Sequence, residues 1–162
     1  MDELGPLQPI PRGGRSWNKT FSRRSNRYPR KGTIQWLAAF APHYGRAVGK
    51  AYPRKRGEDI RDFLEHVLLP LYPLKHIYMI WDNLSSHKCQ KEWQKKFKEH
   101  ISFIWLPTNC PWLNLIESYF SVLCRIALHN TDFKKDVEIS TALEKATDYL
   151  NQNPKQYKWN YL

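Results

Sequence analysis

The stretch His76–Asn83, HIYMIWDN, decides the fold class of this 162-residue chain. Its first six residues form a short, continuous and largely apolar run, which is typical of a central strand covered on both faces. Asp82 follows directly where this strand ends. Ile101–Leu106, ISFIWL, repeats the pattern and is stopped by Pro107. In sheets covered by helices, functional groups collect at the carboxyl ends of the central strands, so the stretch predicts a buried strand and marks Asp82 as a candidate functional acid.

Strands and helices are expected to alternate on both sides of this stretch. Thr33–Ala41 and Arg46–Tyr52 flank a turn and predict a β-hairpin. Glu58–Leu69 carries apolar residues at helical spacing and predicts an amphipathic helix. The remaining expected elements are short extended pieces and loops in Met1–Lys31, and helices over Lys88–His100, Asn114–His129 and Val137–Asn151. This order predicts an α/β fold with a mixed central sheet flanked by helices.

The positive charge of the chain is concentrated in its first third. The net charge is +11, and Leu4–Gly57 contains 13 Lys or Arg residues but no Asp or Glu. The rest of the chain is close to neutral. Such asymmetry indicates a polyanionic partner, most simply nucleic acid; a solvated basic surface without a specific partner is the alternative. Hydrophobic residues make up 41% of the chain, enough for the core of one folded domain.

The cysteines and the hydropathy pattern bear on localisation. Cys89, Cys110 and Cys124 lack metal-ligand spacing such as C-x-x-C and fit reduced thiols of a cytosolic protein. The sequence shows no signal peptide, and no apolar run approaches the ~20 residues needed to cross a bilayer. We therefore expect a cytoplasmic protein that acts without a membrane.

Three acids stand out by their positions in the expected fold. Asp82 follows a buried strand, Glu117 lies in the first turn of a helix, and Asp2 precedes the first extended segment. Each acid also has a structural interpretation: a turn for Asp82, a capping box with Asn114 for Glu117, and a solvated terminus for Asp2. Singly, each acid favours the structural interpretation. The combination favours a shared site.

The spacing between two of these acids resembles a known family. Asp82 and Glu117 enclose 34 residues, and the segment around them reads WDNLSSH, then a helix, then FIWLPTNCPWLNLIESYF. This resembles the mariner superfamily of DDE transposases, in its bacterial insertion-sequence-630-like branch. The matching residues are Asp82, Asn83, His87, Leu106, Pro107, Pro111, Leu113, Asn114, Ile116 and Glu117. The basic N-terminal stretch and the helix Glu58–Leu69 also fit the layout of that family.

The resemblance implies a ribonuclease-H-like fold with a catalytic Asp-Asp-Glu triad. Asp82 matches the second acid and Glu117 the third. Asp2 is the candidate first acid because an Asp-Glu pair followed by a Gly-Pro segment matches Asp2–Pro6, with Glu3 as the weaker alternative. The implied activity is DNA cleavage and strand transfer at insertion-sequence ends. Two Mg²⁺ ions, with Mn²⁺ as substitute, suit three carboxylates because hard cations prefer oxygen ligands.

Further residues have supporting or DNA-binding interpretations. Asn83 and His87 either orient Asp82 or contact a phosphate, or they are a turn residue and a loop imidazole. Asn114 fits a helix cap better than a metal ligand. Basic residues interleaved with aromatic ones predict a track for the DNA backbone. Its candidate residues are Arg12, Arg15, Lys19, Arg23, Arg24, Arg27, Arg30 and Lys31.

The start of the chain departs from the family pattern. Only Met1 precedes Asp2, so the apolar first strand and the upstream helix-turn-helix region of the family are missing. We therefore expect residues 1–162 to be one N-terminally truncated catalytic domain, a homodimer when full length, with Asp2 frayed as terminal residues are. Two rivals remain: a non-catalytic DNA-binding remnant, and another ribonuclease-H-like nuclease that cuts without strand transfer.

Overall fold

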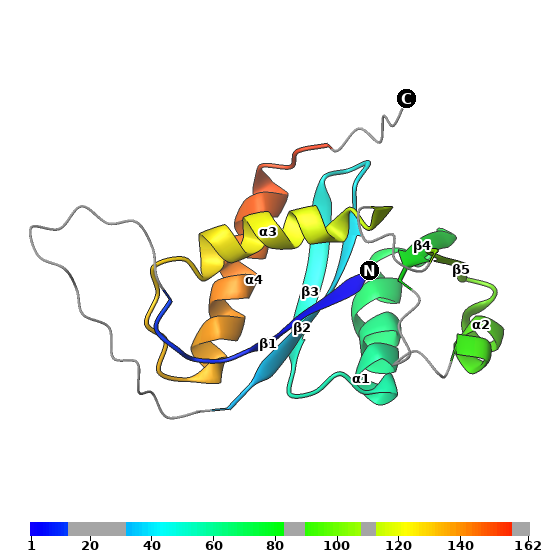
Figure 1. The fold of residues 1–162 in the computed structure, drawn as a ribbon. Coiled ribbons are helices and arrows are strands. Elements are labelled where there is room, and N and C mark those ends of the chain that lie inside the picture. The colour runs from blue at the N-terminus through cyan, green and yellow to red at the C-terminus, as the bar shows by residue number, and fades with distance from the viewer. Residues whose placement is uncertain (13–31, 83–89, 108–112, 157–162) are drawn as a thin grey trace, which may run out of the picture.

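The computed structural model describes residues 1–12, 32–82, 90–107 and 113–156 of the chain. Strands and helices alternate through these residues (Figure 1). The elements are β1 (Asp2–Leu7), β2 (Ile34–Ala41), β3 (Arg46–Tyr52), α1 (Gly57–Asp62), the π-helix η1 (Phe63–Leu68), the 3₁₀-helix η2 (Leu69–Leu71), β4 (Ile77–Trp81), α2 (Gln90–Phe97), β5 (Ile101–Trp105), α3 (Ile116–Ala127) and α4 (Asp136–Gln152). The expected α/β class is confirmed. None of the described helices is long and apolar enough to span a membrane.

The strands form two sheets, whereas the sequence predicted a single mixed sheet. β1, β2 and β3 are antiparallel, and Asp2 lies opposite Ala38. β4 and β5 are parallel, with Ile77 opposite Ile101. A hydrogen bond from the Met1 amino group to the carbonyl of Ile80, at 3.0 Å, links β1 to β4. This hydrogen bond joins the main chains of the two sheets, and side chains of both sheets also share one apolar cluster.

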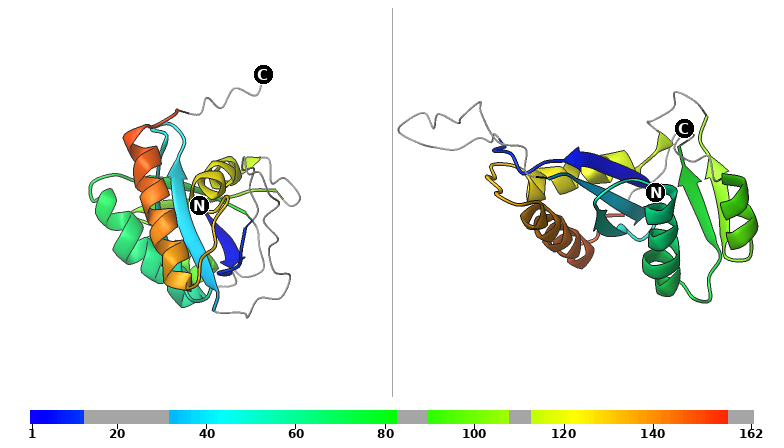
Figure 2. Two further views of the ribbon diagram at one scale, coloured as in Figure 1. Left: turned by 90° about the vertical axis from the view of Figure 1, so that its left-hand side faces the viewer. Right: turned by 90° about the horizontal axis from the view of Figure 1, so that it is seen from below.

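Two apolar cores lie on opposite faces of the three-stranded sheet. Trp36 and Ala38 pack into a cluster with α3 and α4, whereas Leu37 packs into a second cluster with α1, η1, β4 and α2. This division follows from the alternation of side chains along a strand. Figures 1 and 2 show α4 and the β4–β5–α2 unit at opposite ends of the molecule, with the sheet between them. The start of β1 therefore lies in the interior, next to β4.

The local sequence accounts for most element boundaries. The hairpin predicted from Thr33 to Tyr52 is confirmed as β2 and β3. The helix predicted over Glu58–Leu69 begins where the Asp59 carboxylate accepts the backbone N–H of Arg56, at 2.8 Å. It then changes to π-helical geometry over Phe63–Leu68 while keeping the expected apolar stripe buried. The strands and helices predicted after residue 75 are all present, with ends shifted by no more than three residues.

Candidate active site

Asp2 is the most buried of the three candidate acids. It is the first residue of β1 and only 9% exposed. The Asn114 side chain donates a hydrogen bond to its Oδ2 at 2.8 Å, and the backbone N–H of Glu3 donates to its Oδ1 at 2.8 Å. The expectation that Asp2 would fray is therefore wrong. Strand pairing with Ala38 and the bond from Met1 to β4 hold the start of the chain in place.

Asp82 lies beside Asp2 because the start of β1 meets the end of β4. Asp82 follows Trp81, the last residue of β4, and its Oδ1 atom is buried. The negative charge of Asp82 raises the pKa of Asp2. Glu3 points to the opposite face of β1 from Asp2, since neighbouring side chains of a strand alternate. The structure thus brings together Asp2 and Asp82, which are 80 positions apart in the sequence.

Burial dominates the electrostatics of this pair. The pKa of Asp2 is raised from 3.8 to about 7, mainly by burial and to a smaller extent by the negative charges of Asp82 and Glu3. The Glu3 N–H and the Met1 ammonium group oppose this increase. Burial likewise lowers the pKa of the Met1 amino group from 8.0 to about 6. Two carboxylates held in this way resist ionising together unless a cation offsets their charge.

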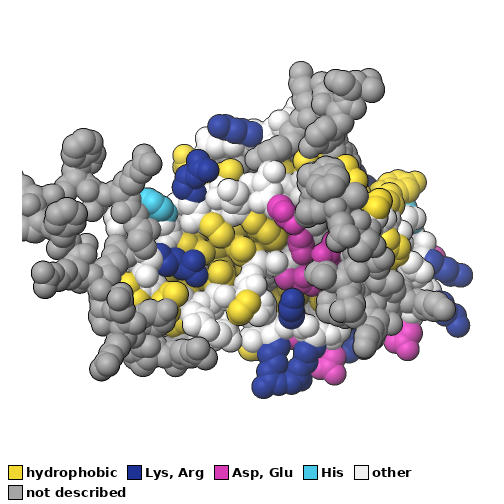
Figure 3. Space-filling view, viewed as in Figure 1, with side chains coloured by type: hydrophobic (Ala, Val, Ile, Leu, Met, Phe, Trp, Pro, Cys, Tyr) yellow, Lys and Arg dark blue, Asp and Glu magenta, His cyan; other side chains and the backbone are white. Residues whose placement is uncertain are grey.

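Glu117 is not brought into the pair. It lies in the first turn of α3, its side chain is exposed, and its backbone N–H donates to the carbonyl of Asn114 at 3.1 Å. Among the described residues, no group of three or more His, Cys, Asp or Glu side chains is arranged so that it could hold a metal ion. Figure 3 shows acidic side chains gathered on this face of the molecule, over the start of β1.

The role expected for Asn114 is corrected by its contacts. The sequence predicted a capping box between Asn114 and Glu117, but the residue at the N-cap of α3 is Leu115, without a side-chain cap. The Asn114 side chain is instead buried and bonded to Asp2. The sequence therefore marked Asn114 as a supporting residue, but the hydrogen-bond partner of its side chain is Asp2 and not the start of α3. A buried amide that is bonded to a carboxylate is placed to orient it, which the helix-start motif alone does not reveal.

Most of the other predicted site residues lie outside the described residues. This applies to the supporting residues Asn83 and His87, and to the candidate DNA-binding residues Arg15, Lys19, Arg23, Arg24, Arg27, Arg30 and Lys31. Arg12 is described. It is partly buried, its backbone N–H donates to the carbonyl of Thr131 at 2.8 Å, and its charge acts on Cys124. Arg12 therefore lies against the segment that follows α3.

The donor set fits a hard divalent cation. Asp2 and Asp82 supply carboxylate oxygens from two adjacent strands, and Mg²⁺ prefers such ligands. Burial makes it costly to ionise Asp2, and a cation bound beside the carboxylates would offset that cost. Asn114 would stay in place as the partner that orients Asp2.

Comparison with known families supports the same class of protein. The model of the DDE superfamily endonuclease family matches residues 1–140, which is most of the chain. The chain therefore belongs to this family, whose members are nucleases that act on DNA and typically use a divalent metal. No curated protein matches the chain. The matched range includes the start of β1, the end of β4 and the first turn of α3, which carry Asp2, Asp82 and Glu117.

Replacing Asn114 by leucine should weaken metal binding and destabilise the fold. The substitution removes a buried donor to a carboxylate, which should lower the free energy of unfolding by about 1–3 kcal/mol. Loss of such an orienting partner typically lowers metal affinity about 10–100-fold. Mn²⁺ titration and thermal unfolding measure both effects. Asn153→Leu, at the exposed C-terminal end of α4, is the matched control. Unchanged Mn²⁺ affinity in Asn114→Leu would show that its bond to Asp2 has no role in the site.

Proposed function

We propose that this chain is the catalytic domain of a DDE transposase of the mariner superfamily, in its insertion-sequence-630-like branch, with a ribonuclease-H-like fold. Its reaction would be metal-dependent cleavage of DNA at insertion-sequence ends, followed by strand transfer. One observation carries the proposal. Asp2 and Asp82, distant in sequence, meet where β1 begins and β4 ends, and the residue that binds Asp2 comes from the motif that contains Glu117.

Each acid has a distinct role in this proposal. Asp2 and Asp82 hold the cations from adjacent strands, and Asn114 is a positioning residue for Asp2. Glu117 is exposed in the first turn of α3, and in this proposal a change of side-chain rotamer turns its carboxylate towards the pair. Two Mg²⁺ ions, or Mn²⁺ in their place, would supply an activated water or 3′-hydroxyl and stabilise the leaving oxygen. The protein residues set the positions of the ligands and exclude bulk water from Asp2.

A nicking assay tests the proposal and separates it from its rivals. The substrate is a plasmid carrying the DNA that flanks the gene for this chain, incubated with Mg²⁺ or Mn²⁺. We expect metal-dependent cuts at the insertion-sequence ends and joined products. Cleavage without joined products would indicate a ribonuclease-H-like nuclease of another kind. DNA binding without metal binding or cleavage would indicate a non-catalytic remnant.

DNA binding should depend strongly on salt, because the acid-free stretch Leu4–Gly57 offers many groups that can bind phosphates. Neutralising four of its arginines should lower the slope of log affinity against log salt by up to about 0.9 for each phosphate that is no longer bound. The four are Arg23, Arg24, Arg27 and Arg30. The control neutralises four exposed lysines elsewhere, Lys95, Lys98, Lys135 and Lys145. Affinity that stays constant between about 50 and 200 mM salt, a range over which binding to many phosphates weakens about 10³-fold or more, would contradict this part of the proposal.

A further inference from the structure

The connection between β3 and α1 is short, exposed and basic. It reads Pro-Arg-Lys-Arg over residues 53–56, and all four residues are exposed. Tyr52 at the end of β3 and Ile60 in α1 are both buried, so the core fixes each end of the connection. We call its three charged residues the basic loop: Arg54, Lys55 and Arg56. They lie outside the set of basic residues that the sequence marked for DNA.

The acids nearest to the basic loop in the chain leave its positive charge in excess. The Asp59 carboxylate accepts the backbone N–H of Arg56 at 2.8 Å, and Asp62 is bonded to a lysine and a tyrosine of β3. Glu58 is exposed in the first turn of α1, and the exposed Arg61 follows three residues later on the same side of the helix. Residues 54–61 thus contain four basic residues and two acids. A surface of this charge attracts an anion.

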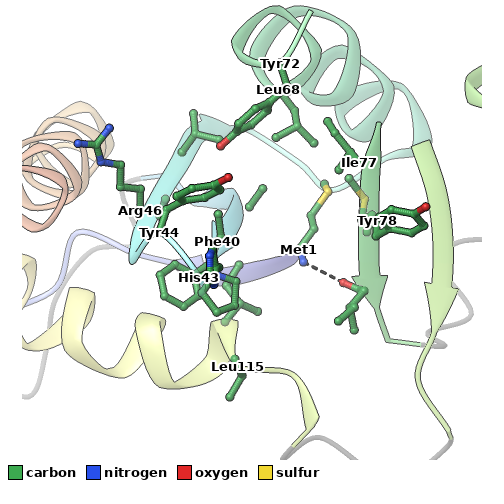
Figure 4. A pocket seen from close by; sticks show the side chains of 18 of the residues that line it. Met1, Phe40, His43, Tyr44, Arg46, Leu68, Tyr72, Ile77, Tyr78 and Leu115 are labelled. Carbon is green, nitrogen blue, oxygen red and sulfur yellow. Dashed lines mark hydrogen bonds between the residues drawn. The ribbon is translucent and has the colours of Figure 1, made fainter. Parts of the chain in front are cut away.

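The basic loop lies on the same face of the molecule as the candidate acids. Asp2 starts β1, which Figure 4 shows joined to β4 by the hydrogen bond of the Met1 amino group. Through Ala38 of β2, Asp2 is in register with Gly49 of β3. Tyr52 is three residues further along β3, so spacings of about 3.4 Å per residue and about 4.8 Å between strands place it about 14 Å from Asp2. Figure 3 shows Lys and Arg side chains directly below the acidic group, where Figure 1 draws the connection from β3 to α1.

This separation matches a few base pairs of DNA. Duplex DNA rises about 3.4 Å per base pair, so about 14 Å corresponds to about four base pairs. The carboxylates at the start of β1 and the end of β4 repel phosphates until a cation offsets their charge. Basic side chains on the same face offset that repulsion and bind phosphates through charge-assisted hydrogen bonds. The arrangement therefore fits a nucleic-acid backbone that runs from the acids to the basic loop.

We propose that the basic loop binds the DNA backbone about four base pairs from the scissile phosphate and so positions the substrate at Asp2 and Asp82. This contact rests on the proposed function only for the location of the scissile phosphate. Arg54, Lys55 and Arg56 are positioning residues, because they lie too far from the acids to touch the reacting atoms. Their loss should therefore raise Kd and KM for DNA and leave kcat unchanged.

The test is the triple variant Arg54→Gln, Lys55→Gln and Arg56→Gln of the full chain, compared with the parent on duplex DNA. Its KM, and its Kd measured without divalent metal, should rise about tenfold or more, because a hydrogen bond to a charged group contributes enough for about that change. The control variant neutralises Lys98, Lys135 and Lys145, which are exposed residues elsewhere. It removes the same charge and should change Kd much less. An equal loss of affinity in the control would overturn the proposal, because net charge alone would then explain the effect.

Phosphate ethylation interference locates the contact on the DNA. In the parent, ethylating phosphates about four base pairs from the cut should weaken binding. The triple variant should lose this interference and keep the rest of the pattern. An unchanged Kd, or the same interference pattern in parent and triple variant, would overturn the proposal. A parent that shows this loop-dependent interference but makes no metal-dependent cut would contradict the proposed function alone, and the basic loop would stand as a DNA contact.

Discussion

Replacing Asp2 by asparagine is expected to stabilise the metal-free protein at pH 8 while abolishing its binding of Mg²⁺ and Mn²⁺. At this pH the buried Asp2 carboxyl is ionised at a cost, because its pKa in the folded protein is raised to about 7. The shift corresponds to at most about 4 kcal/mol. Asparagine removes that cost, but its single amide oxygen can accept only one of the two hydrogen bonds that the carboxylate accepts, from Asn114 and from the Glu3 N–H, so the expected gain is about 2 kcal/mol.

The same shift predicts how stability depends on pH. An acid whose pKa is higher in the folded state binds more protons there, so the free energy of unfolding falls as pH rises from 3.8 to about 7. The Met1 amino group acts in the opposite sense between pH 6 and 8, because its pKa is lowered in the folded state. With respect to these two groups, the metal-free protein should therefore be most stable at and below about pH 4. The Asp2→Asn variant should lose the decline above pH 4.

Chemical denaturation at pH 5 and pH 8, with Mn²⁺ titration by calorimetry, measures both effects. Asp132→Asn is the matched control, because Asp132 is an exposed residue that forms an ion pair with the exposed Lys134. Asp132→Asn should change the free energy of unfolding by no more than about 0.5 kcal/mol. It should leave the affinity for Mn²⁺ unchanged. An Asp2→Asn protein that binds Mn²⁺ as tightly as the parent would remove Asp2 from the metal site.

Replacing Glu117 by glutamine should lower metal-dependent cleavage more than about 100-fold and leave stability nearly unchanged. The loss should exceed that seen for orienting partners of metal ligands, for which about 100-fold is the upper end. Stability should hold because the side chain is exposed and an amide keeps its size. Cleavage of plasmid DNA with Mn²⁺ and thermal unfolding are the measurements.

Glu144→Gln provides the matched control for this second prediction. Glu144 is an exposed residue of α4, so its replacement should affect neither cleavage nor stability. If Glu117→Gln cleaved DNA at the parent rate, Glu117 would be only an acid that interacts favourably with the N-terminal dipole of α3. That result would leave Asp2 and Asp82 as a pair without their third acid.

The fold followed from the sequence where periodicity was strong. The runs around Trp81 and Trp105 specified β4 and β5 because they are short and mostly β-branched or aromatic. The expectation that both faces of these strands are covered is wrong, because Tyr78 and Ile104 are exposed. The division into two sheets could not be predicted, because it depends on how far β1 runs alongside β2 and β4, and no local pattern encodes that. The change from α- to π-helix within Phe63–Leu68 also has no periodic signal, since the apolar stripe is compatible with either geometry.

The candidate site was predictable in its acids but not in their environment. Family motifs selected Asp2, Asp82 and Glu117, and the structure places the first two near each other but not the third. Burial of Asp2 was not anticipated, because a terminal residue is expected to be solvated. The Met1–Ile80 and Asn114–Asp2 hydrogen bonds that cause it connect residues 79 and 112 positions apart. Contacts over such distances depend on tertiary packing, which a single sequence does not display.

A crystal structure of the chain with Mn²⁺ tests the central claim most directly. Anomalous scattering locates Mn²⁺ independently of any assumption about its ligands. The account predicts Mn²⁺ between the carboxylates of Asp2 and Asp82, with the Glu117 carboxylate turned in to join them. It would be contradicted by Mn²⁺ bound elsewhere, or by carboxylates of Asp82 and Glu117 more than about 8 Å apart in the metal-bound state, too far to share a metal pair.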